Sequence, residues 1–333
     1  MATIIDVAKL ANVSKSTVSR VLTDTGSVSE LARKRVLLAI KQLDYHNNKF
    51  AQGYRRNCSN TIGVVLVDMT SAYFCSLLEG IQYVFSEQGM SVLVASGYGV
   101  KEKEIQAIKS LMQRRCDGLI TYLENSVDAT DLSLTERFTT PLITIGPSSA
   151  FQAQASVEID NHAGGYLAAK SLLEAGHKKI VHLAGLSCYQ DAGKRLAGFE
   201  QAMQEYANND YYVVRGKYED QFGYSATKLL LKNGLAFTAI CAGDDDIAAG
   251  VYLALREANI NIPKQVSVIG YDDNFHAKHM FPALSTIKQP SREMGEAAAK
   301  LLLDQLDNKQ SIDKCLKITP SFINRDSIFP VNG

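Results

Sequence analysis

The hydrophobic pattern changes from a helical period to a strand period about 60 residues into the chain. In residues 1–46, apolar positions recur every three or four residues, which predicts three short helices. From Thr61 onward, short runs of β-branched residues alternate with longer amphipathic segments, a pattern typical of a parallel sheet with helices on both faces. We therefore expect a helical domain at residues 1–46, a linker at residues 47–60 and an α/β core at residues 61–333.

Capping residues bound the three helices of the first domain. The first helix is expected to end before Asn12, which tolerates the left-handed conformation of a tight turn. Ser14 is placed to cap a second helix that runs to about Leu22. Ser29 is placed to cap a third, which runs to about Leu43. The positions expected to face inward are Val7, Ala8, Ala11, Val18, Val21, Leu22, Leu31, Val36, Ile40 and Leu43.

The core contains two successive series of predicted strands, separated by helices that stop at Gly89 and Gly176. Two series predict two doubly wound lobes, lobe 1 at about 61–159 and 290–320 and lobe 2 at about 160–289 and 321–330. Such folds bind ligands in a cleft at the carboxyl ends of their strands. The predicted strands are Thr61–Val67, Ser91–Ala95, Gly118–Tyr122, Leu142–Ile145, Lys179–Ala184, Tyr211–Arg215, Ala239–Cys241 and Val266–Gly270.

The composition is that of a globular protein, with 46% hydrophobic and 21% charged residues, which excludes a disordered or fibrous chain. The longest apolar runs, such as residues 62–67, are far shorter than the ~18–20 residues of a membrane span, and no basic-then-apolar leader opens the sequence. Six scattered cysteines without a C-x-x-C pair argue against a disulfide framework or zinc site. We expect a cytoplasmic protein with buried thiols and no membrane partner.

The charge is distributed unevenly although the chain is neutral overall. Residues 1–60 hold ten Lys and Arg residues and four Asp and Glu residues, a formal charge of +6, so the rest of the chain carries −6. A basic head on an acidic body is typical of a polyanion-binding module joined to a separate domain. Chance clustering of solvated charges is the alternative.

The second predicted helix of the head carries small hydroxyls and bases on its polar side. Two short helices joined by a tight turn, the second decorated in this way, form a helix-turn-helix arrangement. The second helix fits the ~12 Å major groove, where Lys15 can donate to guanine acceptors and Arg20 can do so bidentately. We predict DNA binding, with docking of a tri-helical domain onto a protein as the alternative.

The run from Ile5 to Leu22, in which D-V-A is followed by V-S-x-x-T-V-S-R-V-L, resembles the N-terminal signature of the lactose-repressor/galactose-repressor family. The resemblance implies a homodimeric bacterial transcription repressor that needs no cofactor. It implies a helix-turn-helix head and a two-lobed, periplasmic-binding-protein-like core that senses a sugar. In the head, it assigns DNA contacts to Ser14, Lys15, Ser16, Thr17, Ser19 and Arg20.

Residues 47–60 match the hinge helix of this family, which orders on DNA and enters the minor groove as a pair. The resemblance assigns further DNA contacts to Asn48, Ala51 and Tyr54. Family members place a leucine wedge, which kinks the duplex, where this chain has Tyr54. Gly53 precedes it and lowers helix stability by ~1 kcal/mol relative to Ala. The usual bending of the operator is therefore not assumed.

Several polar groups follow predicted strands of the second lobe. An Asp and an Arg at one cleft supply the paired acceptors and donors that the vicinal hydroxyls of a sugar require. Each carboxylate can instead cap a helix, a role for which Asp245 and Asp246 are well placed. By resemblance, the effector contacts are Tyr73, Phe74, Asp191, Arg195, Tyr218, Asp244, Asp272 and Gln289.

Two departures from the family concern the effector. The family usually has Asn where Asp244 stands, and often an Asp or an Asn-Arg pair where this chain has Gly146 and Pro147. The effector is accordingly expected to be cationic, smaller or differently oriented. Tyr73 and Phe74 are expected in the loop after the first strand of the core.

No enzyme motif is present. The sequence lacks G-x-G-x-x-G after a strand, a P-loop, G-x-S-x-G and H-E-x-x-H. Its six histidines are dispersed, so we expect no metal site. The sequence thus predicts a DNA-binding transcriptional regulator controlled by a small ligand. The rival interpretation is a cytoplasmic sugar-binding protein whose basic head docks to a protein partner.

Overall fold

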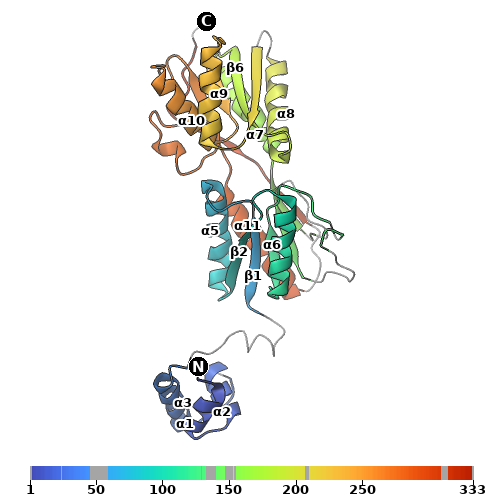
Figure 1. Ribbon diagram of the computed structural model, residues 1–333, viewed down its shortest axis with the longest axis vertical. Coiled ribbons are helices and arrows are strands. Elements are labelled where there is room, and N and C mark those ends of the chain that lie inside the picture. Colours follow the sequence, from blue (N-terminus) through green and yellow to red (C-terminus); the bar gives the residue numbers. More distant parts are fainter. Residues whose placement is uncertain are drawn as a thin grey trace. The chain divides into compact units, whose positions relative to one another are not determined.

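The computed structural model describes residues 2–23, 25–45, 59–128, 130–132, 140–146, 153, 155–206, 210–308 and 314–331. The chain separates into two compact units, Met1–Ser59 and Asn60–Gly333, which we call the head and the core (Figure 1). The predicted hinge contacts Asn48, Ala51 and Tyr54 lie outside the described residues.

Three helices make up the described part of the head, as the apolar spacing predicts. Thr3 Oγ1 accepts from the amide of Asp6, whose carboxylate accepts from the amide of Thr3 in return. Asn12 ends this helix in the left-handed conformation, with φ of 49°. Ser14 Oγ accepts from the amide of Thr17 at 3.1 Å, which confirms its capping role. The helices are α1 (Ile4–Ala11), α2 (Lys15–Thr23) and α3 (Glu30–Gln42).

A small apolar core holds the head helices together. Val7, Val18 and Val36, one from each helix, are fully buried in it. Ser29 caps α3 as predicted. Leu31 was expected to face inward, but it is 64% exposed. It precedes Val36 by five residues, a spacing that turns it by about 140° around the helix, away from the buried face.

Lobe 1 of the core is built on a six-stranded sheet in the order β11-β5-β4-β3-β1-β2. Every described pair of neighbouring strands in it is parallel. All six residues of β1 are buried, as expected for a parallel sheet covered on both faces. The strands are β1 (Thr61–Leu66), β2 (Ser91–Ser96), β3 (Gly118–Thr121), β4 (Leu142–Ile145), β5 (Ala155–Ile159) and β11 (Lys314–Ile318).

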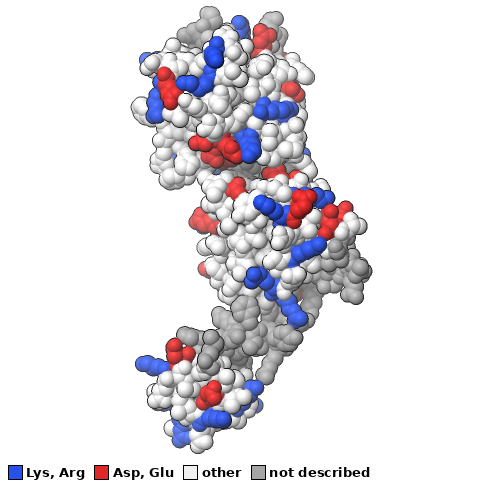
Figure 2. Space-filling model, viewed as in Figure 1, with Lys and Arg blue, Asp and Glu red and all other residues white. Residues whose placement is uncertain are grey.

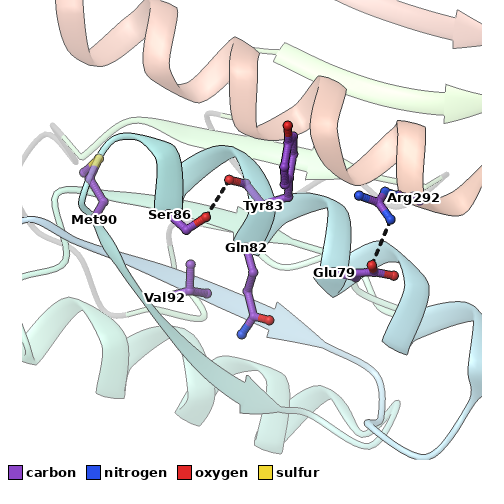
Figure 3. A pocket seen from close by; sticks show the side chains of 7 residues that line it. All are labelled: Glu79, Gln82, Tyr83, Ser86, Met90, Val92 and Arg292. Carbon is purple, nitrogen blue, oxygen red and sulfur yellow. Dashed lines mark hydrogen bonds and ion pairs between the residues drawn. The ribbon is translucent and has the colours of Figure 1, made fainter.

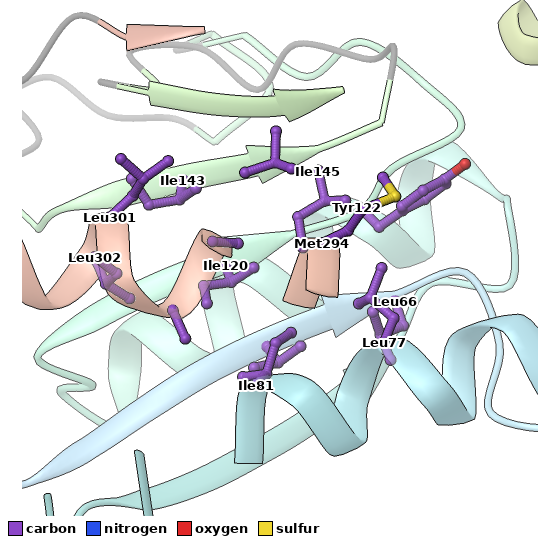
Figure 4. Packing of buried hydrophobic residues seen from close by; sticks show 14 of the residues in the cluster. Leu66, Leu77, Ile81, Ile120, Tyr122, Ile143, Ile145, Met294, Leu301 and Leu302 are labelled. Atoms are coloured by element: carbon purple, nitrogen blue, oxygen red, sulfur yellow. The ribbon is translucent and has the colours of Figure 1, made fainter. Parts of the chain in front are cut away.

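Helices cover both faces of the lobe 1 sheet. Met294, Leu301 and Leu302 pack with Ile120 and Ile143 of the sheet in the cluster shown in Figure 4. Fully burying one such aliphatic side chain contributes ~1.5–3 kcal/mol, so this layer fixes the helices that carry site residues. Two helices lie on this face and the third on the other: α5 (Ala72–Glu87), α11 (Ser291–Asn308) and α6 (Lys101–Gln113).

Lobe 2 is built on a second six-stranded sheet, in the order β12-β10-β9-β8-β6-β7. Its described pairs are parallel except that the edge strand β12 runs antiparallel to β10. Its strands are β6 (Lys179–Gly185), β7 (Asp210–Gly216), β8 (Ala239–Ala242), β9 (Ser267–Asp272), β10 (Ser285–Lys288) and β12 (Ser321–Ile323). Two helices cover each face: α7 (Asn161–Glu174) and α8 (Gln190–Glu205) on one, α9 (Asp220–Lys232) and α10 (Asp245–Glu257) on the other.

The described chain passes between the two sheets three times: after β5, after β10 and between β11 and β12. Asp160, Pro290 and Pro320 stand at these three crossings. The sequence placed the crossings correctly but missed β5, β10, β11 and β12. These strands have three to five residues and contain polar positions, so no apolar run marks them. Gly89 and Gly176 follow their helices with positive φ, as predicted.

Five cysteines lie in the part of the chain that the structure describes, and all are free. Cys116 and Cys241 are buried, but Cys75, Cys188 and Cys315 are exposed. The expectation of buried thiols is wrong for these three, which lie in a first helical turn, a loop and an edge strand. Within the same residues, no helix is long and apolar enough to cross a membrane.

Candidate functional site

The outward face of α2 carries side chains that the sequence assigns to DNA contact. Val18 and Val21 are buried on the inner side of the helix. Lys15, Ser16 and Arg20 are exposed, so their polar groups are accessible to a partner. Lys and Arg side chains are visible on several sides of the head in Figure 2.

Hydroxyl groups gather at the amino end of α2. Ser14 Oγ lies 2.7 Å from Ser16 Oγ and 2.8 Å from Thr17 Oγ1, while Thr17 and Ser19 are half-buried. Helix amino ends and hydroxyls bind phosphate oxygens, and basic side chains reach base edges. A hollow at the α1–α2 turn adjoins this end and is lined by Ile5, Ala8, Lys9, Asn12, Val13, Ser14 and Lys15.

Arg195, in α8, is the centre of a polar cluster in the core and is only 6% exposed. Its Nη1 donates to the carbonyl of Gly243 at 2.7 Å, and its Nε donates to Asn161 Oδ1 at 3.0 Å. Its Nη2 lies 3.1 Å from Asp191 Oδ2 and 3.9 Å from Asp272 Oδ1. A planar guanidinium held on all these sides is a rigid donor.

Asp272 ends β9 in a backbone conformation that L-residues rarely adopt, with φ of 110°. Gln289 Nε2 donates to its carboxylate, and the amide of Gln289 donates to its carbonyl at 3.1 Å. Burial raises the pKa of Asp272 to about 7, although Arg195 and the Gln289 hydrogen bond favour the charged form. The two hydrogen bonds from Gln289 hold the crossing after β10 against Asp272.

Asp191 lies in the first turn of α8, where helix amides stabilise negative charge. The hydroxyl of Tyr218 donates to its Oδ2 at 3.2 Å. The ring of Tyr218 stacks on that of Tyr189, with centroids 5.6 Å apart. Burial raises the pKa of the Tyr218 hydroxyl, so it stays a hydrogen-bond donor at neutral pH.

The three aspartates after β8 have separate roles. Asp244, not Asp245 or Asp246, caps α10: its Oδ1 accepts from the amide of Ile247 at 2.7 Å. The capping role expected of Asp245 and Asp246 is therefore wrong, because the helix begins one residue earlier than those positions require. Asp245 accepts from Thr286 Oγ1 at 2.7 Å inside the lobe. Asp246 accepts from Asn274 Nδ2 at 3.2 Å.

Tyr73 and Phe74 lie in the first turn of α5, not in the preceding loop where we expected them. The helix starts early because Ser71 caps it. Both rings are 8% exposed and meet the ring of Tyr122 edge to face, with centroids 6.0 and 5.0 Å away. Asp272, Arg195 and Asp191 all influence the pKa of Tyr73, so these lobe 1 rings lie near the Arg195 cluster.

The sequence missed Glu124 and Glu104. Glu124 follows β3, and burial raises the pKa of its carboxyl to about 8, with Asp191 and Glu104 adding to the rise. Glu104 is fully buried and accepts from the amides of Glu124 and Asn125 at 2.9 and 3.2 Å. The carboxyl-end rule for parallel strands could have found Glu124 after the predicted strand at residues 118–122. No sequence signal marks Glu104.

The structure thus brings together most of the predicted effector residues. Direct contacts join Arg195 to Asp191 and Asp272, Tyr218 to Asp191, and Gln289 to Asp272. Asp244 is linked to the cluster through the charges of Asp272 and Arg195, which affect its pKa. Phe74 touches only the rings of Tyr73 and Tyr122 among its described aromatic contacts.

His177 and His182 are buried, whereas His162, His276 and His279 are exposed. His182 stacks on Phe199 with ring centroids 4.7 Å apart, and its Nδ1 lies 2.9 Å from the Cys241 carbonyl oxygen. Burial lowers the pKa of His182 to about 4. Across the described ranges, no group of three or more metal-ligating side chains comes together.

A second hollow lies on lobe 1, between α5, β2 and α11 (Figure 3). Tyr83, on its rim, is 52% exposed. Arg292 Nη1 lies 2.8 Å from Glu79 Oε1, and its guanidinium carbon lies 5.6 Å from the Tyr83 ring centroid. The lining residues are Glu79, Gln82, Tyr83, Ser86, Met90, Val92 and Arg292.

Two family models match separate parts of the chain. Residues 3–48 match the model for bacterial regulatory proteins of the lacI family, and residues 169–328 match that for a periplasmic binding protein-like domain. The HTH-type transcriptional repressor PurR of Salmonella paratyphi B is 34% identical over 331 residues, which cover 98% of this chain and 97% of PurR. The chain belongs to the lacI family. This lacI-family chain is a ligand-controlled DNA-binding regulator of transcription and not an enzyme.

Solved structures of the family share the fold of this lacI-family chain. The lac repressor dimer bound to operator and the anti-inducer ONPF has a TM-score of 0.85 at 27% identity, covering 98% of this chain and 99% of the other. A LacI family regulator from Enterococcus faecium with bound ribose has a TM-score of 0.71 at 28% identity, covering 82% of this chain and all of the other. These similarities confirm the helix-turn-helix head and the two-sheet α/β core.

Proposed function

We propose that this chain is a cytoplasmic, homodimeric repressor whose head binds a DNA operator through α2 under the control of a sugar or sugar derivative held around Arg195. The observation that carries the proposal is the Arg195 cluster, in which a fixed guanidinium and the carboxylates of Asp191 and Asp272 offer paired donors and acceptors. Relatives bound to ribose and to operator DNA support both halves.

In this proposal the DNA-binding domain comprises residues 1–46, the hinge residues 47–60 and the ligand-binding part residues 61–333. Lys15, Ser16 and Arg20 read base edges, while Ser14, Thr17 and Ser19 hold phosphates. Asn48, Ala51 and Tyr54 contact the minor groove when paired hinges order. The ligand contacts are Tyr73, Phe74, Asp191, Arg195, Tyr218, Asp244, Asp272 and Gln289.

Replacement of Arg20 by alanine tests the head. Arg20→Ala removes an exposed side chain, so we expect an unchanged fold and a loss of ~1–3 kcal/mol in operator binding. A competition mobility-shift assay on genomic fragments measures this loss and the sequence preference. Unchanged binding, or binding without sequence preference, contradicts the DNA-reading role and favours a head that docks to a protein.

Ligand control requires a coupling between the two sites of ~1–3 kcal/mol. Ligand binding changes the orientation of the two lobes relative to each other. This change determines whether the paired hinges become ordered in the minor groove. A thermal-shift panel of sugars and small metabolites, followed by operator titration with each hit, measures the coupling. If no ligand of a broad panel alters operator affinity, ligand control is wrong.

Two exposed apolar features support pairing with a second copy. Tyr83 lies beside the hollow on α5 and β2, and Phe281, in lobe 2, is 97% exposed. Exposed aromatic side chains are enriched at interfaces, and a lac repressor relative is a dimer. We expect Tyr83→Asp or Phe281→Asp to shift the mass in light scattering towards a monomer. Tyr98→Asp, at another exposed tyrosine of lobe 1, serves as the control and leaves the dimer intact.

A further inference from the structure

The Arg195 cluster holds more carboxyl groups than cations. Arg195 pairs with Asp191 and Asp272, and its Nη1 donates to the carbonyl of Gly243, which directly precedes Asp244. Arg195 also influences the pKa values of Asp244 and Glu124, whose charged forms are disfavoured by burial. Asp191 and Asp272 share its guanidinium at 3.1 and 3.9 Å. One cation therefore stands against four carboxyl groups, and two of these have no share in the ion pairs.

Asp244 is the first of these two carboxyl groups. It is 6% exposed, and among the described residues it has no cation within ion-pair distance. Its one described hydrogen bond, from the amide of Ile247 at 2.7 Å, needs only a side-chain oxygen. Asn caps a helix as well as Asp does, so the cap does not account for a buried carboxyl group at this position.

Glu124 is the second, and it reaches the cluster from lobe 1. Its backbone is fixed by Glu104, and within the described chain its carboxylate has neither a hydrogen bond nor an ion pair. Glu124 is half-buried and follows Tyr122 by two residues, and its charge influences the pKa of Tyr122. The faces of aromatic rings attract cations.

From this balance we infer that the effector carries a protonated amine, as an amino sugar does, and that Asp244 receives it, with Glu124 adding to the attraction for a cation. The inference rests on the proposed function, since it specifies the ligand of that same site. A neutral sugar gives neither carboxyl group a counter-charge, so the cost of ionising them remains. An anionic ligand adds further negative charge. An amine next to a polyol ring pairs with Asp244 and leaves Arg195, Asp191 and Asp272 for the hydroxyls.

The ligand experiment uses the full-length protein and calorimetry. Glucosamine, galactosamine and mannosamine are compared with their neutral parent sugars, their N-acetyl derivatives, the corresponding uronic acids, and Mg²⁺ alone. We expect at least one amine to bind, and its N-acetyl counterpart to bind at least about 30-fold more weakly, because a buried charge then lacks its partner. Asp244→Asn weakens the amine by about tenfold or more, and Glu124→Gln weakens it less. Both variants reduce the preference for the amine over its neutral parent sugar.

The outcomes separate the amine inference from the proposed ligand control. Tighter binding of a neutral sugar, a uronic acid or Mg²⁺ than of every amine overturns the amine inference and leaves ligand control intact. If the amines do not bind, the inference is likewise overturned. If no ligand class binds or changes operator affinity, the proposed function falls as well.

A second experiment needs no ligand. In the free protein, burial raises the pKa of Asp244, so its carboxyl group lowers stability at neutral pH. Asp244→Asn removes this cost and keeps the cap, so we expect the melting temperature to rise by about 2–4 °C. The matched control is Asp160→Asn: Asp160 also caps a helix, through the amide of Ala163, but it pairs with Lys317 at 2.7 Å. This control is expected to leave the melting temperature unchanged or lower. A fall with Asp244→Asn shows that its carboxylate already has a counter-charge, and overturns the inference.

Discussion

A single buried carboxylate, that of Glu104, organises the loop after β3. It accepts from the amides of Glu124 and Asn125 and from Asn125 Nδ2, at 2.9, 3.2 and 3.1 Å. These bonds determine where the side chain of Glu124 points. The hydrogen bonds described for Glu104 all go to this loop, so Glu104 is a positioning residue.

We expect Glu104→Gln to destabilise the protein by about 1–3 kcal/mol. Glutamine has the same shape but offers one acceptor oxygen, so its NH₂ group faces amide donors that can no longer be satisfied. Urea unfolding of the full chain measures the change. Glu102→Gln, on the exposed part of the same helix, is the control. Equal unfolding free energies for the two variants would show that the buried bonds contribute nothing.

Single residues also show what the sequence can reveal. Asn12, Ser14 and Ser29 were identified correctly because caps and left-handed positions depend on neighbours within four residues. Leu31 was misplaced because the spacing of apolar residues alone does not determine which side of a first helical turn faces the core. Glu104 could not be found at all, since its partners are some 20 residues away in sequence and meet it only in the fold.

Among the elements, the contact between α7 and α8 decides how the ligand site is held. Gly198 of α8 lies so close to α7 that a Cβ there would stand 1.9 Å from the carbonyl oxygen of His162. Gly165 of α7 approaches the carbonyl of Arg195 to the same extent. Because α8 carries Asp191 and Arg195, a shift of this helix moves the guanidinium.

Gly198→Ala is therefore expected to lower the unfolding free energy by about 1–3 kcal/mol, and to weaken ligand binding as well. Thermal or urea unfolding and calorimetry provide the two measurements. Gly193→Ala is a matched control in the same helix, where a Cβ meets nothing within 4 Å. There, alanine is expected to be neutral or to stabilise by up to ~1 kcal/mol. A Gly198→Ala variant as stable as this control would refute the close packing.

The elements themselves were predictable where the sequence held a long enough apolar run. β1, β4 and β6 were placed to within a residue or two because their buried runs are continuous. The ends of the helices near the ligand site were less accessible. Ser71 and Asp244 act as caps, which put Tyr73 in a helix and removed Asp245 and Asp246 from the role expected of them.

At the scale of the whole molecule, the buried carboxyl groups give stability an unusual pH dependence. Burial raises the pKa of Asp272 to about 7 and that of Glu124 to about 8. The folded chain thus holds these protons more tightly than the unfolded chain does. The stability that they contribute is complete at low pH and is lost as the pH rises through the folded pKa values.

Without ligand, the melting temperature of the full chain is expected to fall between pH 6.5 and pH 8.5. The buried histidines do not offset this trend, because burial lowers the pKa values of His177 and His182 and their contribution changes only at lower pH. Differential scanning calorimetry across the range measures the slope, and Glu124→Gln is expected to flatten it. A slope that is unchanged in this variant would contradict the assignment.

The three passages of the chain between the lobes differ in their torsional freedom. Proline fixes its own φ near −65° and keeps the preceding residue out of the helical region. The backbone torsions of the links at Pro290 and Pro320 are therefore restricted. The link at Asp160 has no such ring. Reorientation of the lobes is thus concentrated at the Asp160 link. Exchange of the Asn161 and His162 amides with deuterium should change with ligand, whereas that of Ser321, which follows Pro320, should not.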